Sequence, residues 1–301
     1  MSAPRVIGVD LGGTKILSGL VERDGTISTC RERVTPAASQ AELLAALEEE
    51  VAALLAAEPA AVGLGIPSRR DKLTGRAAGA VNLPLADVDV AGLLRSRFGL
   101  PVGVENDGNA AALAEWRLGA GRGAQDLVML TLGTGVGGGL VLGGRLYRGW
   151  AELGHMVVVA GGPPCAGSCS GHGHLEAVAS GRVADRIAGE TLGNGARAQD
   201  LIAAARGGDA RAVGALAELG SLLGAGIGSL VNVFDPDVVV VGGGFGASAG
   251  ELVLASAREA ARAEALAPAA ERVRIVEAEL GAAAGLIGAG LVGFEALDGE
   301  R

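Results

Sequence analysis

The chain has 301 residues, 49% of them hydrophobic, and a formal net charge of −9. It holds two lysines, Lys15 and Lys72, and its scattered arginines form no basic run, which argues against nucleic acid or an anionic membrane as a partner. A small neutral or chelated substrate fits this balance better, and the length suffices for two domains or one large one.

The chain predicts the same strand plan twice, each time followed by helices and strands. The first 120 residues predict strands at 6–10, 16–22 and 26–34, a helix at 40–57, a strand at 61–66, a helix at 90–98, a strand at 101–104 and a helix after Asp107. The remainder predicts strands at 126–132, 138–142 and 145–147, a Cys/His-rich loop at 163–174, helices over 176–206 and 210–233, a strand at 238–241, a helix, a strand at 273–276 and a last helix from about 282. We expect residues 1–120, completed by the C-terminal helix 282–301, to form an N-terminal α/β domain, and residues 121–281 to form a larger C-terminal α/β domain.

Two features of the chain bear on location. The longest uncharged stretch, residues 219–234, carries Ser, Asn and Gly and is shorter than the roughly 20 apolar residues that a bilayer span needs, so we expect a buried helix there. Met1–Pro4 leads straight into a predicted strand, which indicates a cytoplasmic protein. Cys30, Cys165 and Cys169 cannot all pair, and disulfides are not expected in a reducing compartment.

Three predicted strands end in glycine-rich turns: D-L-G-G-T-K at 10–15, L-G-T-G-V-G-G-G at 132–139 and V-G-G-G-F at 241–245. A single such turn is typical of any hairpin. Three of them, two with the same Gly-Thr chemistry, predict backbone N–H groups that converge on phosphate oxygens. Asp10, in front of the first turn, is suited to hold Mg²⁺. The residues concerned are Gly12, Gly13, Thr14, Lys15, Gly133, Thr134, Gly135, Gly243 and Gly244.

Two carboxylates and an amide crowd one strand–helix junction, V-E-N-D-G-N at 104–109. Asn and Asp are preferred helix N-caps, and a carboxylate there complements the helix dipole. A cap needs only one of Glu105, Asn106 and Asp107, so the pattern leaves both capping and catalysis open.

The loop C-A-G-S-C-S-G-H-G-H places Cys165, Cys169 and His174 at a spacing that suits a tetrahedral structural Zn²⁺. His172 competes with His174 as a ligand, and a reduced, metal-free loop is the alternative.

These motifs together carry a resemblance. D-L-G-G-T-K, V-E-N-D-G-N-A-A-A-L-A-E, T-L-G-T-G-V-G-G-G-L, A-E-L-G-H and a Cys/His segment ending in G-H-L-E stand in the order found in the ROK family of bacterial sugar kinases and repressors. The sequence resembles the glucokinases of that family most, over residues 5–291. The resemblance implies the two-domain actin-like ATPase (ribonuclease H-like) fold, with ATP on the glycine turns and a sugar deeper in an interdomain cleft.

The resemblance also implies roles for single residues. Asp107 matches the general base that takes the proton of the sugar hydroxyl during phosphoryl transfer, and Asn106 matches a sugar ligand. Glu105 is expected to make a solvent or structural contact. The other residues matched to sugar binding are Glu152, His155, Glu176, Gly65 and, more weakly, Asn82.

The chain departs from the family pattern at three places. His174 stands where the family usually has a third Cys, which leads us to expect a Cys2His2 zinc site completed by His155. G-I-P-S at 65–68 replaces G-I-P-G. The link between Gly149 and Glu152 is only Trp150-Ala151, and this shortening either leaves space for a substituent on the sugar 2-position or lets the Trp150 ring exclude one; we favour exclusion.

The sequence thus predicts an ATP-dependent hexose kinase, specifically a glucokinase that forms glucose 6-phosphate, with ATP, Mg²⁺ and a structural Zn²⁺. N-acetylmannosamine kinase and fructokinase are the alternatives within the family, and polyphosphate is an alternative donor. A non-catalytic sugar-sensing regulator is disfavoured because Asp107 and all three glycine turns are present, and a DNA-binding repressor because only nine residues precede Asp10. A homodimer or higher homo-oligomer is expected.

Overall fold

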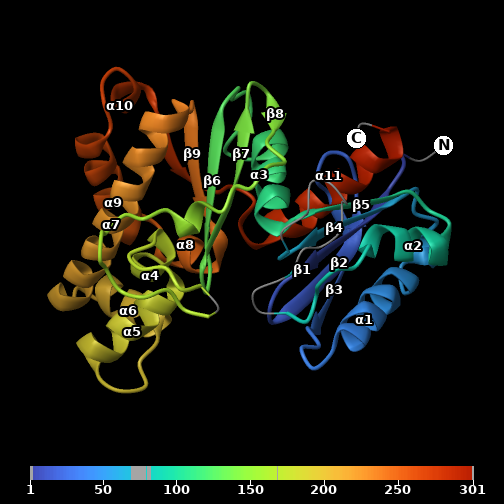
Figure 1. Cartoon of the computed structure of the whole chain (residues 1–301), viewed down its shortest axis with the longest axis horizontal. Coiled ribbons are helices and arrows are strands. Elements are labelled where there is room, and N and C mark those ends of the chain that lie inside the picture. The colour runs from blue at the N-terminus through green and yellow to red at the C-terminus, as the bar shows by residue number, and fades with distance from the viewer. Residues whose placement is uncertain (1–2, 69–78, 80–82, 168, 300–301) are drawn as a thin grey trace. The chain divides into compact units, whose positions relative to one another are not determined.

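The computed structural model describes residues 3–68, 79, 83–167 and 169–299. The chain divides into two compact units (Figure 1). Unit 1 comprises Met1–Leu118, Arg148–Trp150 and Ala283–Arg301, and unit 2 comprises Gly119–Tyr147 and Ala151–Ala282. Each unit is built on a five-stranded mixed sheet with helices packed against it.

Unit 1 contains a sheet with the strand order β3-β2-β1-β4-β5. Its strands are β1 (Val6–Leu11), β2 (Lys15–Val21), β3 (Ile27–Val34), β4 (Val62–Ile66) and β5 (Val102–Asn106). Its helices are α1 (Gln40–Ala52), η1 (Leu55–Ala57), α2 (Val90–Phe98), α3 (Asp107–Leu118) and α11 (Ala284–Asp298), which follows the short turn η3 (Gly281–Ala283). β2 is antiparallel to both β1 and β3, whereas β1, β4 and β5 run parallel.

The helix expected at 40–57 ends earlier than its periodicity predicts. Ser39 caps α1 by accepting a hydrogen bond from the backbone N–H of Glu42, but α1 stops at Ala52 and a separate 3₁₀ turn, η1, follows. The apolar pattern continues across the break because Leu54 is buried in the same core as Leu47. Periodicity alone therefore overestimates the helix by its last turn.

α11 lies directly on one face of the unit 1 sheet, against β1 and β4, and also contacts α3. Glycines make this close approach possible. A Cβ atom on Gly63 of β4 would lie 1.8 Å from the carbonyl oxygen of Ala289, and one on Gly8 of β1 would lie 2.7 Å from that of Leu286. Since both distances are shorter than van der Waals contact, α11 can lie this close to the sheet only because positions 8 and 63 carry glycine.

Unit 2 repeats the plan with the strand order β10-β9-β6-β7-β8. Its strands are β6 (Leu127–Leu132), β7 (Val136–Leu142), β8 (Arg145–Leu146), β9 (Val238–Gly242) and β10 (Arg274–Glu277). Its helices are η2 (Leu153–His155), α4 (Leu175–Val178), α5 (Gly181–Leu192), α6 (Ala198–Arg206), α7 (Ala210–Phe234), α8 (Gly243–Ala249), α9 (Glu251–Glu264) and α10 (Ala269–Arg272). As in unit 1, a central strand pairs with an antiparallel hairpin partner on one side and a parallel strand on the other. The repeated strand–turn–strand plan expected from the sequence is confirmed.

Among the described residues, two helical segments, Ala210–Phe234 and Gly281–Asp298, are long and apolar enough to cross a membrane by length and composition, and half of the most apolar window of each is buried inside the protein. α7 packs along α9, where Cβ atoms on Gly220 and Gly224 would each lie 2.3 Å from a backbone carbonyl oxygen. The stretch 219–234 thus belongs to a helix with one face buried, as expected. This burial is what a core helix of a globular protein shows.

Candidate functional site

Two carboxylates, Asp10 and Asp107, lie close together in unit 1. Asp10 is near the end of β1 and Asp107 begins α3. Burial raises the pKa of the Asp10 carboxyl from 3.8 to about 6, the nearby Asp107 carboxylate adds to the rise, and Lys15 opposes it. A Cβ on Gly65 would lie 3.6 Å from the Cα of Asp107 and 3.8 Å from Oδ1 of Asp10, and one on Gly285 would lie 2.3 Å from Oδ2 of Asp10. Gly285 therefore leaves space for the Asp10 carboxylate, and Gly65 lies in contact distance of both acids.

The three polar side chains at the β5–α3 junction make different contacts. Asn106 provides the cap, because its Oδ1 accepts a hydrogen bond from the backbone N–H of Asn109 at 3.1 Å. Oδ1 of Asp107 accepts from the backbone N–H of Gly108 at 2.9 Å. Glu105 is 4% exposed and accepts from the Asn109 side chain and from Arg148. Capping therefore occupies the amide, and the contacts of Glu105 are structural.

The first glycine turn, between β1 and β2, is held by a residue that the sequence motifs do not include. The backbone N–H of Gly12 donates to the carbonyl of Lys15 at 2.9 Å, which closes the turn. Oγ1 of Thr35, which is buried, donates to the carbonyl of Gly12 at 2.8 Å, and the Thr35 N–H donates to the carbonyl of Thr14 at 3.0 Å. The Lys15 ammonium is paired with the exposed Glu32 at 3.0 Å.

The second glycine turn, between β6 and β7, rests on the start of α5. The N–H of Gly133 donates to the carbonyl of Gly135 at 2.9 Å, and the N–H groups of Gly181 and Arg182 donate to the carbonyls of Gly133 and Thr134. The third predicted turn lies against it, because a Cβ on Gly243 (φ +82°) would lie 2.6 Å from the backbone of Leu132. Unit 2 therefore brings residues 132–135 and 243 together.

Glu176 in α4 reaches the second glycine turn. Its Oε2 accepts a hydrogen bond from the backbone N–H of Val136 at 3.0 Å, and a Cβ on Gly135 would lie 2.0 Å from the same oxygen. Gly135 is thus required for the carboxylate to approach the turn. The motif that matches Glu176 to a sugar ligand does not predict this contact.

Four side chains in unit 2 converge on one point: His155, Cys165, Cys169 and His174, whose ligand atoms all lie within 4.8 Å of one another. The loop that carries them is folded by two isolated bridges, Val157↔His174 and Pro164↔His172. His172 is exposed and lies outside this group of four. The geometry thus selects His174, rather than His172, as the histidine of the loop that faces the cysteines.

The spacing of these atoms suits a tetrahedral metal. Nδ1 of His155 and Nδ1 of His174 are 3.2 Å apart, and Sγ of Cys165 and Cys169 lie 3.0 and 3.7 Å from Nδ1 of His174. Around a tetrahedral Zn²⁺, two nitrogens lie about 3.3 Å apart and a nitrogen and a sulfur about 3.5 Å. A Cβ on Gly171 would lie 2.2 Å from the His174 ring, so the loop leaves room for this ring only by carrying glycine there.

The thiol of Cys165 resists ionisation in the absence of a nearby cation. Burial raises the pKa of the Cys165 thiol to about 11, with further contributions from Cys169 and from the negative charge of Glu176. The backbone N–H of Gly171 donates a hydrogen bond to Sγ of Cys169 at 3.4 Å. Two thiols and two imidazoles form a donor set typical of structural zinc, so the residues fit the metal.

The remaining predicted sugar residues are dispersed over the two units. Glu152 immediately precedes η2, which ends at His155, and both belong to unit 2. Trp150 is 57% exposed and belongs to unit 1. Asn82 lies outside the described residues.

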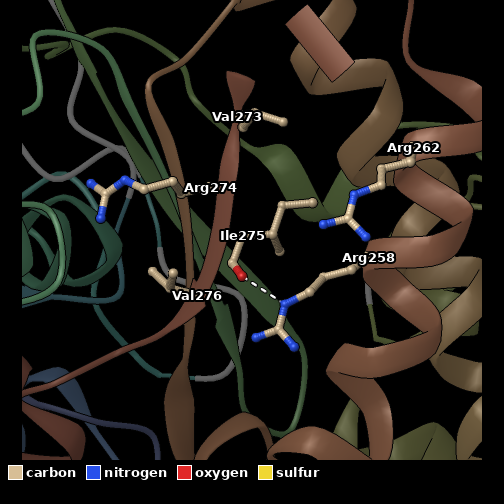
Figure 2. A pocket seen from close by; sticks show the side chains of 6 residues that line it. All are labelled: Arg258, Arg262, Val273, Arg274, Ile275 and Val276. Atoms are coloured by element: carbon tan, nitrogen blue, oxygen red, sulfur yellow. Dashed lines mark hydrogen bonds between the residues drawn. The ribbon is translucent and has the colours of Figure 1, made fainter. Parts of the chain in front are cut away.

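A separate pocket of about 240 Å³ lies between α9 and β10 in unit 2, lined by Arg258, Arg262, Val273, Arg274, Ile275 and Val276. Figure 2 shows Arg258 and Arg262 reaching from the helix while Arg274 points away on the other side of the strand. Nε of Arg258 donates to the carbonyl of Ile275 at 2.8 Å, as the dashed line marks. None of the predicted site residues that the structure describes lines this pocket.

The chain is similar over nearly its whole length to sugar kinases. It is 34% identical over 308 residues to a glucokinase of Streptomyces coelicolor, covering 94% of this chain and 95% of the relative. It is 34% identical over 300 residues to an N-acetylmannosamine kinase of Shigella boydii, covering 95% and 97%. The crystal structure of a ROK family glucokinase from Streptomyces griseus in complex with glucose and AMPPNP superposes with a TM-score of 0.84 at 35% identity, covering 97% of this chain and 99% of that one.

The two mixed sheets, with their repeated strand plan, are those of the actin-like ATPase fold expected from the sequence. The ROK family model matches residues 6–293. The chain belongs to the ROK family.

Proposed function

We propose that this protein is an ATP-dependent glucokinase, which transfers the γ-phosphoryl group of ATP to the 6-hydroxyl of glucose. The observation that carries the proposal is the Asp107 carboxylate, placed at the start of α3 beside Asp10 and Gly65. The similarity to glucokinases over nearly the full chain supports it.

Asp107 is the proposed general base. A sugar hydroxyl is a poor nucleophile at neutral pH, so a carboxylate must accept its proton as the oxygen attacks. In the proposed step, the 6-oxygen of glucose forms a bond to the γ-phosphorus, its proton passes to Asp107, and the bond between the γ-phosphorus and the bridging oxygen breaks to release ADP. Asp107, which lies beside Asp10 and Gly65, is the carboxylate of the junction that we assign to this role.

Asn106, Glu152, His155 and Glu176 are the proposed sugar ligands. Oδ1 of Asn106 is used in capping, which leaves its NH₂ group to donate to a hydroxyl. Nδ1 of His155 faces the metal ligands, so Nε2 is the atom that we assign to the sugar. Oε2 of Glu176 accepts from Val136, and we assign its Oε1 to the sugar.

The two Gly-Thr turns and Gly243–Gly244 are the proposed ATP phosphate site. Thr35 donates hydrogen bonds to carbonyl groups of the first turn, and the start of α5 donates to carbonyl groups of the second. These hydrogen bonds support a preorganised backbone at the phosphate site. Asp10 is the proposed Mg²⁺ ligand, and its raised pKa, caused by burial and by Asp107, fits a position that a cation would stabilise. When bound, Mg²⁺ would neutralise phosphate charge.

His155, Cys165, Cys169 and His174 are the proposed ligands of one structural Zn²⁺. The group lies outside the phosphoryl-transfer chemistry in this proposal. It orders the loop in front of α4, and Glu176 follows His174 by two residues. A bound ion would therefore fix the positions of His155 and Glu176.

An N-acetylmannosamine kinase is the second candidate. Two observations favour it: the relative with that activity covers nearly the whole chain, and Trp150, which we expect to exclude a 2-substituent, is largely exposed. We further propose that the protein acts in the cytoplasm as a homodimer or higher homo-oligomer, and that the two units are its two domains.

A substrate panel tests the function. Phosphoryl transfer should be measured for glucose, mannose, fructose and N-acetylmannosamine, with ATP and with polyphosphate as donors, and the product position assigned by NMR. Glucose with ATP should give the highest kcat/KM and phosphate on the 6-oxygen. A clear preference for N-acetylmannosamine would replace the glucokinase assignment while keeping the mechanism. Sugar binding without turnover on any substrate would indicate a sensor.

A further inference from the structure

The Glu105 carboxylate is almost completely buried, and it makes three hydrogen bonds. Its Oε1 accepts from the backbone N–H of Asn106 at 3.0 Å and from the side-chain amide of Asn109 at 3.1 Å. Its Oε2 accepts from Nε of Arg148 at 2.9 Å. The carboxylate is 4% exposed, so its charge depends on the guanidinium for compensation.

Arg148 joins three separate parts of unit 1. Its Nε binds Glu105 at the end of β5, and its second nitrogen binds the carboxylate of Glu295 on α11. One guanidinium thereby bridges two carboxylates that are separated from it by 43 and 147 residues along the chain. A planar fork with several N–H donors can do this, whereas a lysine ammonium cannot reproduce the geometry.

Arg148 begins a short segment of unit 1 that interrupts unit 2 along the chain. The segment Arg148–Trp150 belongs to unit 1, although the residues before and after it belong to unit 2. Four residues beyond Arg148 the chain reaches Glu152, a proposed sugar ligand. The same cluster bonds the N–H of Asn106, next to the proposed base Asp107.

We propose that Arg148 is a positioning residue for the sugar. Through its bond to Glu105 it holds the backbone that carries Asn106 and Asp107. Because Arg148 is itself held in unit 1, it also fixes the start of the segment that leads to Glu152. This inference rests on the proposed kinase function and extends it, and it assigns Glu105 and Arg148 no direct contact with substrate or cofactor. Loss of Arg148 leaves Glu105 buried and without its cation, next to the two residues that the reaction requires.

The test compares steady-state kinetics of Arg148→Met with wild type. A displaced sugar site should raise the KM for glucose and lower kcat, each by about tenfold, because small misplacements of reacting groups are costly. The KM for ATP should stay within about twofold, since the glycine turns lie outside the cluster. Glu105→Gln should likewise raise the KM for glucose and lower kcat while leaving the KM for ATP nearly unchanged. The kcat/KM of the double variant should be little lower than that of either single variant, because both residues act through one contact.

A matched control is available in the same unit. Arg31 pairs with Glu50, which is also almost completely buried, at 3.0 Å. Arg31→Met should lower the melting temperature but leave the KM for glucose unchanged. If Arg148→Met fails to fold, Arg148→Lys carries the test, because it keeps the charge without the fork and should show a weaker version of the same split.

The outcomes separate the inference from the function on which it rests. A wild-type protein that phosphorylates no hexose would overturn both. An active wild type whose Arg148 variants keep the wild-type KM for glucose and kcat would overturn the inference alone. Additive effects of Glu105→Gln and Arg148→Met on kcat/KM would also overturn it, since they would mean that the two residues act independently.

Discussion

Replacing Asp10 with Asn should stabilise the ligand-free protein by an amount that grows with pH. The pKa of this carboxyl is raised from 3.8 to about 6, chiefly by burial and then by repulsion from Asp107. The folded state therefore binds the proton more tightly than the unfolded state does. The stabilising contribution of Asp10 is fully present below about pH 4 and is lost as the pH rises through about 6.

The size of the effect follows from the shift. About two pKa units, at 1.36 kcal/mol for each unit, correspond to about 3 kcal/mol of stability lost by the wild type above the folded-state pKa. About half of this loss falls between pH 5 and pH 8. The Asn side chain does not ionise, so the difference in unfolding free energy between Asp10→Asn and wild type should grow over that interval by about 1–2 kcal/mol.

Tryptophan fluorescence provides a suitable assay. Both tryptophans of the chain, Trp116 and Trp150, belong to unit 1, which also contains Asp10. Urea unfolding should be followed at several values between pH 5 and pH 8, with EDTA and without ATP. In an Asp107→Asn background the pH-dependent gain should shrink, because one cause of the shift is gone. A difference that is constant with pH, or that favours the wild type at high pH, would refute the reasoning.

Three further predictions concern the base, the metal group and the packing of α11. Asp107→Asn should lower kcat by about 10²–10⁴-fold while glucose affinity, measured by calorimetry, changes little; unchanged turnover would remove Asp107 as the base. Elemental analysis should find one Zn²⁺ per wild-type chain. Both Cys169→Ala and Gly171→Ala should lose the metal, the second because its Cβ would lie 2.2 Å from the His174 ring. A wild-type protein that is zinc-free and fully active would contradict this prediction. Gly63→Ala should destabilise the protein by about 3 kcal/mol or more in urea unfolding, because the new Cβ would lie 1.8 Å from the Ala289 carbonyl oxygen. An unchanged unfolding midpoint would show that α11 does not pack on β4.

Local patterns in the sequence determined most of the secondary structure. The helix predicted at 90–98 is α2, and the strands predicted at 6–10 and 16–22 agree with β1 and β2 within one residue. Hydrophobic periodicity and glycine turns act over a few residues, so they are visible without the fold. The ROK family could be recognised for the same reason, because its motifs are short and occur in a fixed order.

The candidate site was only partly predictable. The spacing of Cys165, Cys169 and His174 is local and predicts a metal loop, but the choice of His174 over His172 required the bridge that turns His172 outward. The contact of Glu176 with Val136 spans 40 residues, and no motif indicates it.

Only the tertiary structure decided how the polar residues of the β5–α3 junction divide their tasks. The sequence leaves capping and catalysis open for Asn106 and Asp107. In the fold, Asn106 accepts a hydrogen bond from the helix start, and Asp107 lies beside Asp10. Glu105 finds its partner, Arg148, 43 residues away. Such contacts depend on which elements pack together, and this is set by the burial of whole helix and sheet faces, which no short stretch of sequence contains.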